Sequence, residues 1–175
     1  LGSAPSVTAV AEKDSDLDRL EIEVEEGVLE IRRGSWVSSL FSMGKSHGSV
    51  TVNVVANELQ SVNSSSGANA DLTDIICSDL RLDASSGSRV EVSGRCDTVV
   101  IDASSGANVD SSDLITTDAD VDASSGASIR VFARNSFSGD ASSGSRIRVY
   151  GNPEVAESET SSGASIDLRS HAQTI

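Results

Sequence analysis

Residues 102–107 read DASSGA, and the same phrase returns with small changes at 83–88, 122–127 and 140–145. The glycine of this phrase recurs every 18 to 20 residues, at Gly67, Gly87, Gly106, Gly126, Gly144 and Gly163. Gly48 lies 19 residues before the first of them and is interpreted as the start of an earlier, degenerate copy. A period this short is typical of β-solenoid repeats, because most helical repeats need about 33 residues or more.

Apolar and polar residues alternate after each repeat glycine. The third residue is apolar in all six copies, and the fifth is apolar in every copy except at Ser111. A period of two is typical of a β-strand with one buried face. The residues before the glycine, such as Ile101 and Ala103, predict a second strand, and a third side is more weakly marked. Each repeat is therefore expected to hold three short strands and three corners, with SSG at one corner.

One such repeat cannot bury its own apolar face, but stacked repeats can, when equivalent strands lie in parallel register about 4.8 Å apart. The sequence therefore predicts an all-β protein, a parallel β-helix (solenoid) with about 19 residues per coil. We expect a single domain over 1–175, with irregular strands and a cap over 1–47, regular coils over 48–170 and a tail over 171–175. Within the cap, LEIEVEEGVLEI (20–31) predicts two strands around a turn at Glu26–Gly27.

Composition excludes several classes of protein. A formal net charge of −14 repels phosphate backbones, so no nucleic-acid partner is expected. No apolar run approaches the roughly 20 residues of a transmembrane segment. The first ten residues, LGSAPSVTAV, lack the basic and apolar regions of a signal peptide, which fits a cytosolic protein or a mature exported one.

Three stretches carry a resemblance to a known family: LDRLEIEVEEGVLEIRRG (17–34), VTVNVVANELQSVNSSSGAN (50–69) and the tandem V-x-I-D-A-S-S-G-A units. With them the chain resembles the bacterial head GIN domain family of putative auto-transporter adhesins. The resemblance implies a single-stranded, right-handed β-helix and no known catalytic residue. It also implies export to the periplasm, outer membrane or cell surface of a Gram-negative bacterium.

The two cysteines, Cys77 and Cys96, each lie ten residues before a repeat glycine. In a parallel stack their Cα atoms would lie about 4.8 Å apart, which suits either a disulfide or a pair of stacked thiols. Without supporting histidines they favour no metal site, and we expect no metal and no cofactor. The two histidines, His47 and His171, fall in no catalytic motif, so we assign no catalytic residue.

An acidic residue occupies the fourth position before five of the repeat glycines: Asp83, Asp102, Asp122, Asp140 and Glu159. Stacked carboxylates would attract calcium. The GGxGxDxUx repeat of calcium-binding solenoids is absent, however. The sequence therefore favours a solvated edge on which each Asp bonds the backbone of its own corner.

A basic and aromatic patch interrupts the acidic pattern. Arg130 and Arg148 share one repeat position, and Phe132 and Tyr150 share another. Guanidinium groups beside aromatic faces suit a sugar bearing a carboxylate, but also a structural ladder or a subunit contact, and we favour the last two. The apolar segment SWVSSLFSMGKSHG (35–48) is interpreted as a plug for the first coil rather than a docking loop.

Two functions fit these features. The favoured one is a non-catalytic, exported β-helix that presents a rigid surface to a glycan or to an envelope or cell-surface protein. The alternative is a carbohydrate-active β-helix (a polysaccharide lyase or hydrolase) or a glycan-binding module, although the evenly spaced carboxylates single out no catalytic pair. An ice-binding solenoid would need a Thr-rich face. Any homo-oligomer is expected to form through a coil end or through the Arg and aromatic patch.

Overall fold

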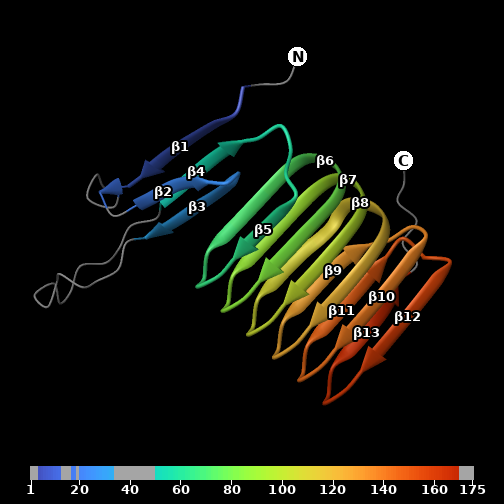
Figure 1. The fold of residues 1–175 in the computed structure, drawn as a ribbon. Coiled ribbons are helices and arrows are strands. Elements are labelled where there is room, and N and C mark those ends of the chain that lie inside the picture. The colour runs from blue at the N-terminus through green and yellow to red at the C-terminus, as the bar shows by residue number, and fades with distance from the viewer. Residues whose placement is uncertain (1–3, 13–16, 19, 34–49, 170–175) are drawn as a thin grey trace, which may run out of the picture. The chain divides into compact units, whose positions relative to one another are not determined.

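The structure is a computed structural model that describes residues 4–12, 17–18, 20–33 and 50–169 (Figure 1). It divides into two compact units, residues 1–57 and 58–175. Within the described residues the secondary structure is strand almost throughout, and no helix has the length and apolar character that crossing a membrane requires.

The first unit contains two small antiparallel pairs of strands. β1 (Ser6–Ala11) pairs with β4 (Val50–Val55), and β2 (Leu20–Glu25) pairs with β3 (Val28–Arg33). Glu26 and Gly27 join β2 to β3 with φ angles of 50° and 83°, the backbone of a type I′ hairpin turn. The predicted hairpin around these two residues is thus confirmed.

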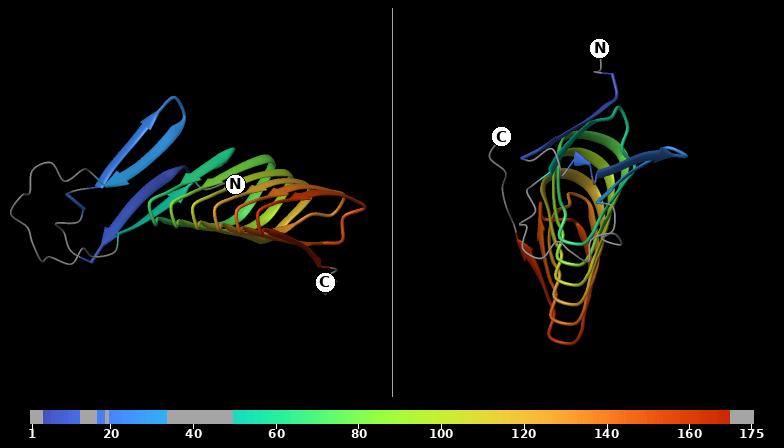
Figure 2. Two further views of the ribbon diagram at one scale, coloured as in Figure 1. Left: turned by 90° about the horizontal axis from the view of Figure 1, so that it is seen from below. Right: turned by 90° about the vertical axis from the view of Figure 1, so that its left-hand side faces the viewer.

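The second unit is a stack of parallel coils (Figure 2). Three coils each contain one long strand: β6 (Asn69–Ala84), β7 (Arg89–Ala103) and β8 (Asn108–Ala123). The other coils are built from shorter strands: β5 (Ser61–Ser64), β9 (Ser128–Phe132), β10 (Ser136–Ala141), β11 (Arg146–Tyr150), β12 (Val155–Thr160) and β13 (Ser165–Arg169). Together they confirm the predicted solenoid of about 19 residues per coil.

Equivalent positions lie over one another through the whole stack. Val90 is in register with Val109, which is followed along the axis by Ile129, Ile147 and Ile166. The first four of these side chains are completely buried, so they form one continuous aliphatic core. Stacking lets each coil cover the apolar face that its neighbour could not bury alone.

The SSG phrase forms the tight corner of each coil. Ser105 and Gly106 have φ angles of 52° and 72°, and Ala107 N–H donates to the Ser104 carbonyl oxygen at 3.0 Å. This is a type I′ turn, whose two central residues both need positive φ. Gly106 N–H also donates to the carbonyl oxygen of Ser125 on the next coil, 3.1 Å away, so the corner ties consecutive coils together.

Serine hydroxyls bond along the axis at another position, directly after the repeat glycine. Ser88 and Ser145 stand there where other coils have alanine, and both are buried. Their hydroxyls donate to the carbonyl oxygens of Ser64 and Ala123, each at 2.9 Å. A buried hydroxyl is tolerated because its hydrogen bond offsets the loss of water.

The corners other than SSG differ from the predicted three strands and three corners per coil. β6, β7 and β8 continue through these bends, and the ladder shifts register between Leu72 and Ile75. A β-bulge therefore replaces a turn there. Gly94 packs against this bulge so closely that a Cβ on it would lie 2.1 Å from the Ile75 carbonyl oxygen.

The regular coils also begin later than residue 48. β4 pairs antiparallel with β1, and the parallel stack starts at β5. The reason is the phase of alternation: Thr51 and Asn53 are polar at the two positions where the repeats are apolar. The right-handed sense of the coils stays a prediction from the family resemblance.

Candidate functional site

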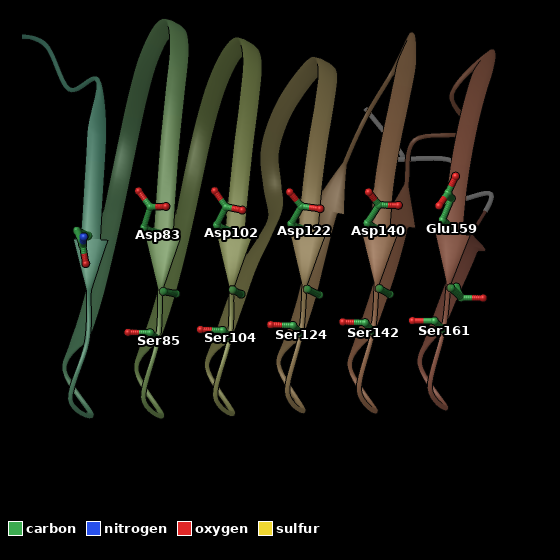
Figure 3. A pocket seen from close by; sticks show the side chains of 16 residues that line it. Asp83, Ser85, Asp102, Ser104, Asp122, Ser124, Asp140, Ser142, Glu159 and Ser161 are labelled. Atoms are coloured by element: carbon green, nitrogen blue, oxygen red, sulfur yellow. The ribbon is translucent and has the colours of Figure 1, made fainter.

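A groove along one side of the stack carries the same polar residues from coil to coil (Figure 3). Its carboxylates come from the fourth position before each glycine: Asp83, Asp102, Asp122, Asp140 and Glu159. Its hydroxyls come from the second position before each glycine: Ser85, Ser104, Ser124, Ser142 and Ser161. In Figure 3 the two rows run side by side along the stack.

The strand period explains why these rows are regular. Asp102 is in register with Asp83 on one side and with Asp122 on the other. The residue between the two rows points into the core, as Ala103 does with 4% of its surface exposed. Since neighbouring strands lie about 4.8 Å apart, the groove repeats one carboxylate and one hydroxyl at that spacing.

One end of the carboxylate row is partly neutralised by Arg81. Its Nη2 lies 3.0 Å from Asp83 Oδ1, and the same guanidinium pairs with Asp102. The hydrogen bond and charge of Asp83 raise the pKa of Arg81, with a smaller contribution from Asp102. The sequence predicted that each Asp bonds the backbone of its own corner, and this prediction is wrong for Asp83 and Asp102, which bond Arg81 instead.

Farther along the row, repulsion dominates. Burial raises the pKa of Asp122, and the carboxylates of Asp102, Asp140 and Asp120 raise it further. Among the described residues no Lys, Arg or His forms an ion pair with Asp122 or Asp140. This part of the groove is thus a line of mutually repelling negative charges.

The described residues contain no group of three or more His, Cys, Asp or Glu side chains placed to hold a metal ion. In-register carboxylates lie in a line along the axis, whereas calcium takes six to eight oxygen ligands that surround it. The groove therefore differs from the cage that a bound calcium ion would require.

The Arg and aromatic residues are stacked as predicted, and the burial of Phe132 argues against the glycan-binding alternative. Arg130 is in register with Arg148, and Phe132 with Tyr150. Phe132 is only 6% exposed, so its ring cannot stack on a bound sugar. It follows the outward-facing phase of β9 and lies outside the aliphatic core, but its ring is buried because it packs against Gly151.

Arg130 is held by the coil before it. Its Nη1 lies 2.8 Å from Asp110 Oδ2, and Ser112 also donates to Asp110. Burial acts to raise the pKa of Asp110, but the hydrogen bonds from Ser112 and Arg130 outweigh it and hold the pKa below its ordinary value. These contacts support a structural ladder. Because the Arg130 guanidinium already bonds Asp110, it is less available to a ligand.

Cys77 and Cys96 are in register on adjacent coils, with Cα atoms 4.6 Å apart, and they form a disulfide. This separation lies within the usual range for such bonds. The other expectations, for His47, His171 and the plug at 35–48, lie outside the described residues.

Comparison with known proteins gives a family and a fold. The model of a family described as putative auto-transporter adhesin, head GIN domain, matches residues 2–153. A crystal structure of a putative adhesin from Bacteroides fragilis is 11% identical, with a TM-score of 0.70 over 89% of this chain and 79% of that one. A structure of a putative lipid binding protein from Parabacteroides distasonis is 17% identical, with a TM-score of 0.56 over 96% and 85%. Among curated proteins the comparison finds no match.

Proposed function

Because the chain belongs to the head GIN domain family of putative auto-transporter adhesins, we propose that it is a non-catalytic, exported protein that binds a partner through the rigid side of its β-helix. The location that fits is the cell envelope or surface of a Gram-negative bacterium. The partner is a glycan or an envelope or cell-surface protein. The name of the Bacteroides fragilis structure, a putative adhesin, supports the same role.

The repetition of the groove is the observation that carries this proposal. Five successive coils present a carboxylate and a serine hydroxyl at the same two positions, from Asp83 and Ser85 to Glu159 and Ser161. Acid–base catalysis instead needs titratable groups whose environments push their pKa values apart at one place. A repeating array suits a partner that is itself extended or that makes many equivalent contacts.

The groove has more support as the contact surface than the Arg and aromatic patch. Phe132 is buried and Arg130 is paired with Asp110, so half of the four proposed glycan contacts are already used inside the protein. The groove residues lie on the outer face of the stack, and Asp122 and Asp140 are exposed.

Binding and turnover assays test the proposal together. The protein is screened against a glycan array and against immobilised outer-membrane vesicles, and then compared with the groove variant Asp102→Asn/Asp122→Asn/Asp140→Asn. A matched control, Asp71→Asn/Glu91→Gln/Asp113→Asn, removes the same charge from a different part of the solenoid. We expect binding to fall in the groove variant only.

Incubation with acidic polysaccharides separates the proposal from the enzymatic alternative. No product is expected. Release of unsaturated or shortened sugars would contradict the non-catalytic role, and equal loss of binding in both triple variants would contradict the assignment of the groove.

A further inference from the structure

The last strand of the stack, β13, has one open edge. It pairs with β11, and no other described strand pairs with it. Ser165 N–H donates to the Ser145 carbonyl oxygen at 3.0 Å, which shows which backbone groups face β11. Because backbone groups alternate sides along a strand, those of Ile166 and Leu168 face the open edge.

The same coil leaves apolar surface uncovered. Leu168 is 56% exposed, whereas Val149, its partner in register on the coil before, is 1% exposed. Every earlier coil is covered by the next one, and this coil lacks such a neighbour among the described residues. An open edge beside exposed apolar surface is a template for pairing with another strand.

We propose that this edge pairs antiparallel with the same edge of a second copy of the chain. Leu168 then lies opposite Leu168 of the second copy, and the two exchange both backbone hydrogen bonds. In this register Asp167 lies opposite Arg169 of the second copy, and Arg169 opposite Asp167. The two copies are related by a two-fold axis, as in most homodimers.

Charge selects this register. A shift that sets Asp167 opposite itself would place two carboxylates side by side, which is unfavourable for a cross-strand pair. Opposite charges at both flanks of Leu168 are favourable, and Leu168 contributes an apolar pair on the core side. The strand is thus complementary to itself in one register.

The other open edge of the last coil behaves differently. Among the described strands β12 pairs only with β10, and its solvent-facing side carries Glu157 and Glu159 without a basic residue. Two copies of β12 would bring these carboxylates together. Acidic side chains on an edge strand are a common protection against such pairing, so β13 and not β12 is the contact.

Sedimentation of the full chain over a concentration series tests this proposal. In this register the described strands overlap over three residues, Asp167 to Arg169, which is a small interface, so we expect a weak monomer–dimer equilibrium that becomes visible at about 1 mM. Arg169→Asp or Asp167→Arg makes the strand self-repelling and should weaken dimerisation at least about tenfold. The double variant Asp167→Arg/Arg169→Asp keeps complementarity in the same register and should dimerise like the wild type.

A mixture of the two single variants gives a stricter test. The Arg169→Asp variant carries two acidic residues at the edge, and the Asp167→Arg variant carries two basic ones. We expect them to form a heterodimer with each other. A wild type that stays monomeric throughout, or single variants that dimerise like the wild type, would overturn the proposal. Hydrogen exchange at the Leu168 amide should slow with rising concentration, and slow exchange at every concentration would show that another part of the chain covers this edge.

Discussion

The ring of Phe137 occupies the space that a side chain on Gly139 would fill: a Cβ on Gly139 would lie 2.3 Å from Cζ of Phe137. In the preceding coil the same two positions hold Ala119 and Val121. The coil of β10 therefore has its large side chain, Phe137, at the first position. The preceding coil has its larger side chain, Val121, at the second. The core of each coil is constrained by the total volume of its layer rather than by the residue at any one position.

Exchanging these volumes should reveal compensation. Gly139→Val alone overpacks the layer and should cost about 1–3 kcal/mol of unfolding free energy. Phe137→Ala alone leaves a cavity and should cost about 3–5 kcal/mol. The double variant Phe137→Ala/Gly139→Val imitates the preceding coil, so its loss should be well below the sum of the two. Urea denaturation measures all three, and additive losses would contradict the shared-volume account.

The two central residues of a corner should respond differently to substitution. Gly106 has a φ of 72°, and a Cβ on it would meet nothing within 4 Å. Gly106→Ala should therefore cost about 1–2 kcal/mol, from backbone strain alone. Ser105 already has a side chain at a φ of 52°, so Ser105→Gly should change stability by less than about 1 kcal/mol. Thermal denaturation compares them, and an unchanged Gly106→Ala protein would argue against the type I′ corner.

Asp122 and Asp110 should have opposite effects on stability at neutral pH. The pKa of Asp122 is raised above the ordinary value of 3.8 by burial and by its carboxylate neighbours. Its ionisation therefore opposes folding, and Asp122→Asn should stabilise the protein at pH 7. The gain should disappear as the pH falls below the folded pKa, and it should shrink when salt screens the row.

Asp110→Asn is the matched variant, and it should lower the stability of the protein at pH 7. The pKa of Asp110 is held below the ordinary value of 3.8, because hydrogen bonds from Ser112 and Arg130 outweigh burial. Its ionisation stabilises the fold above pH 3.8, and this contribution is lost as the pH falls through the folded pKa. Chemical denaturation between pH 3 and pH 7 measures both variants. The same sign for both at pH 7 would contradict the assigned electrostatics.

The disulfide should stabilise the solenoid by closing a short loop. Cys77 and Cys96 are separated by 19 residues, and closing a loop of that size is worth about 3 kcal/mol in the chain-entropy model. Cys77→Ser/Cys96→Ser should lower the melting temperature accordingly. In the wild type neither thiol should react with an alkylating reagent until the unfolded protein is reduced, and alkylation without reduction would show that the bond is absent.

Much of the fold follows from the sequence because the repeat imposes it. A strict period and a buried strand face allow few arrangements besides stacking, so the register of Val109 over Val90 could be predicted. The prediction of regular coils from residue 48 is wrong for β4, because the spacing of Gly48 matches the repeat whereas the strand after it pairs antiparallel with β1. The polar residues at Thr51 and Asn53 carried the contrary signal in the phase of alternation.

The site was less predictable, because contacts between coils decide it. Sequence position brought Arg130 and Phe132 to one patch, but could not show that Arg130 pairs with Asp110 or that Phe132 is buried against Gly151. Alternation places Phe132 on the outer face of β9, and it carries no signal of the packing against Gly151 that buries the ring. The acidic row was correctly located, whereas its link to Arg81 depends on the side-chain reach of a residue two positions away.

The stacking of equivalent positions is tested most directly by distances between spin labels placed on the serine row. Labels at Ser85 and Ser161, four coils apart, should lie about 19 Å from each other at the spacing of neighbouring strands. Labels at Ser104 and Ser142, two coils apart, should lie at about half that distance. Narrow distance distributions in this ratio are the expected result. Broad distributions, or separations that do not grow with the number of coils, would contradict the solenoid and with it the groove.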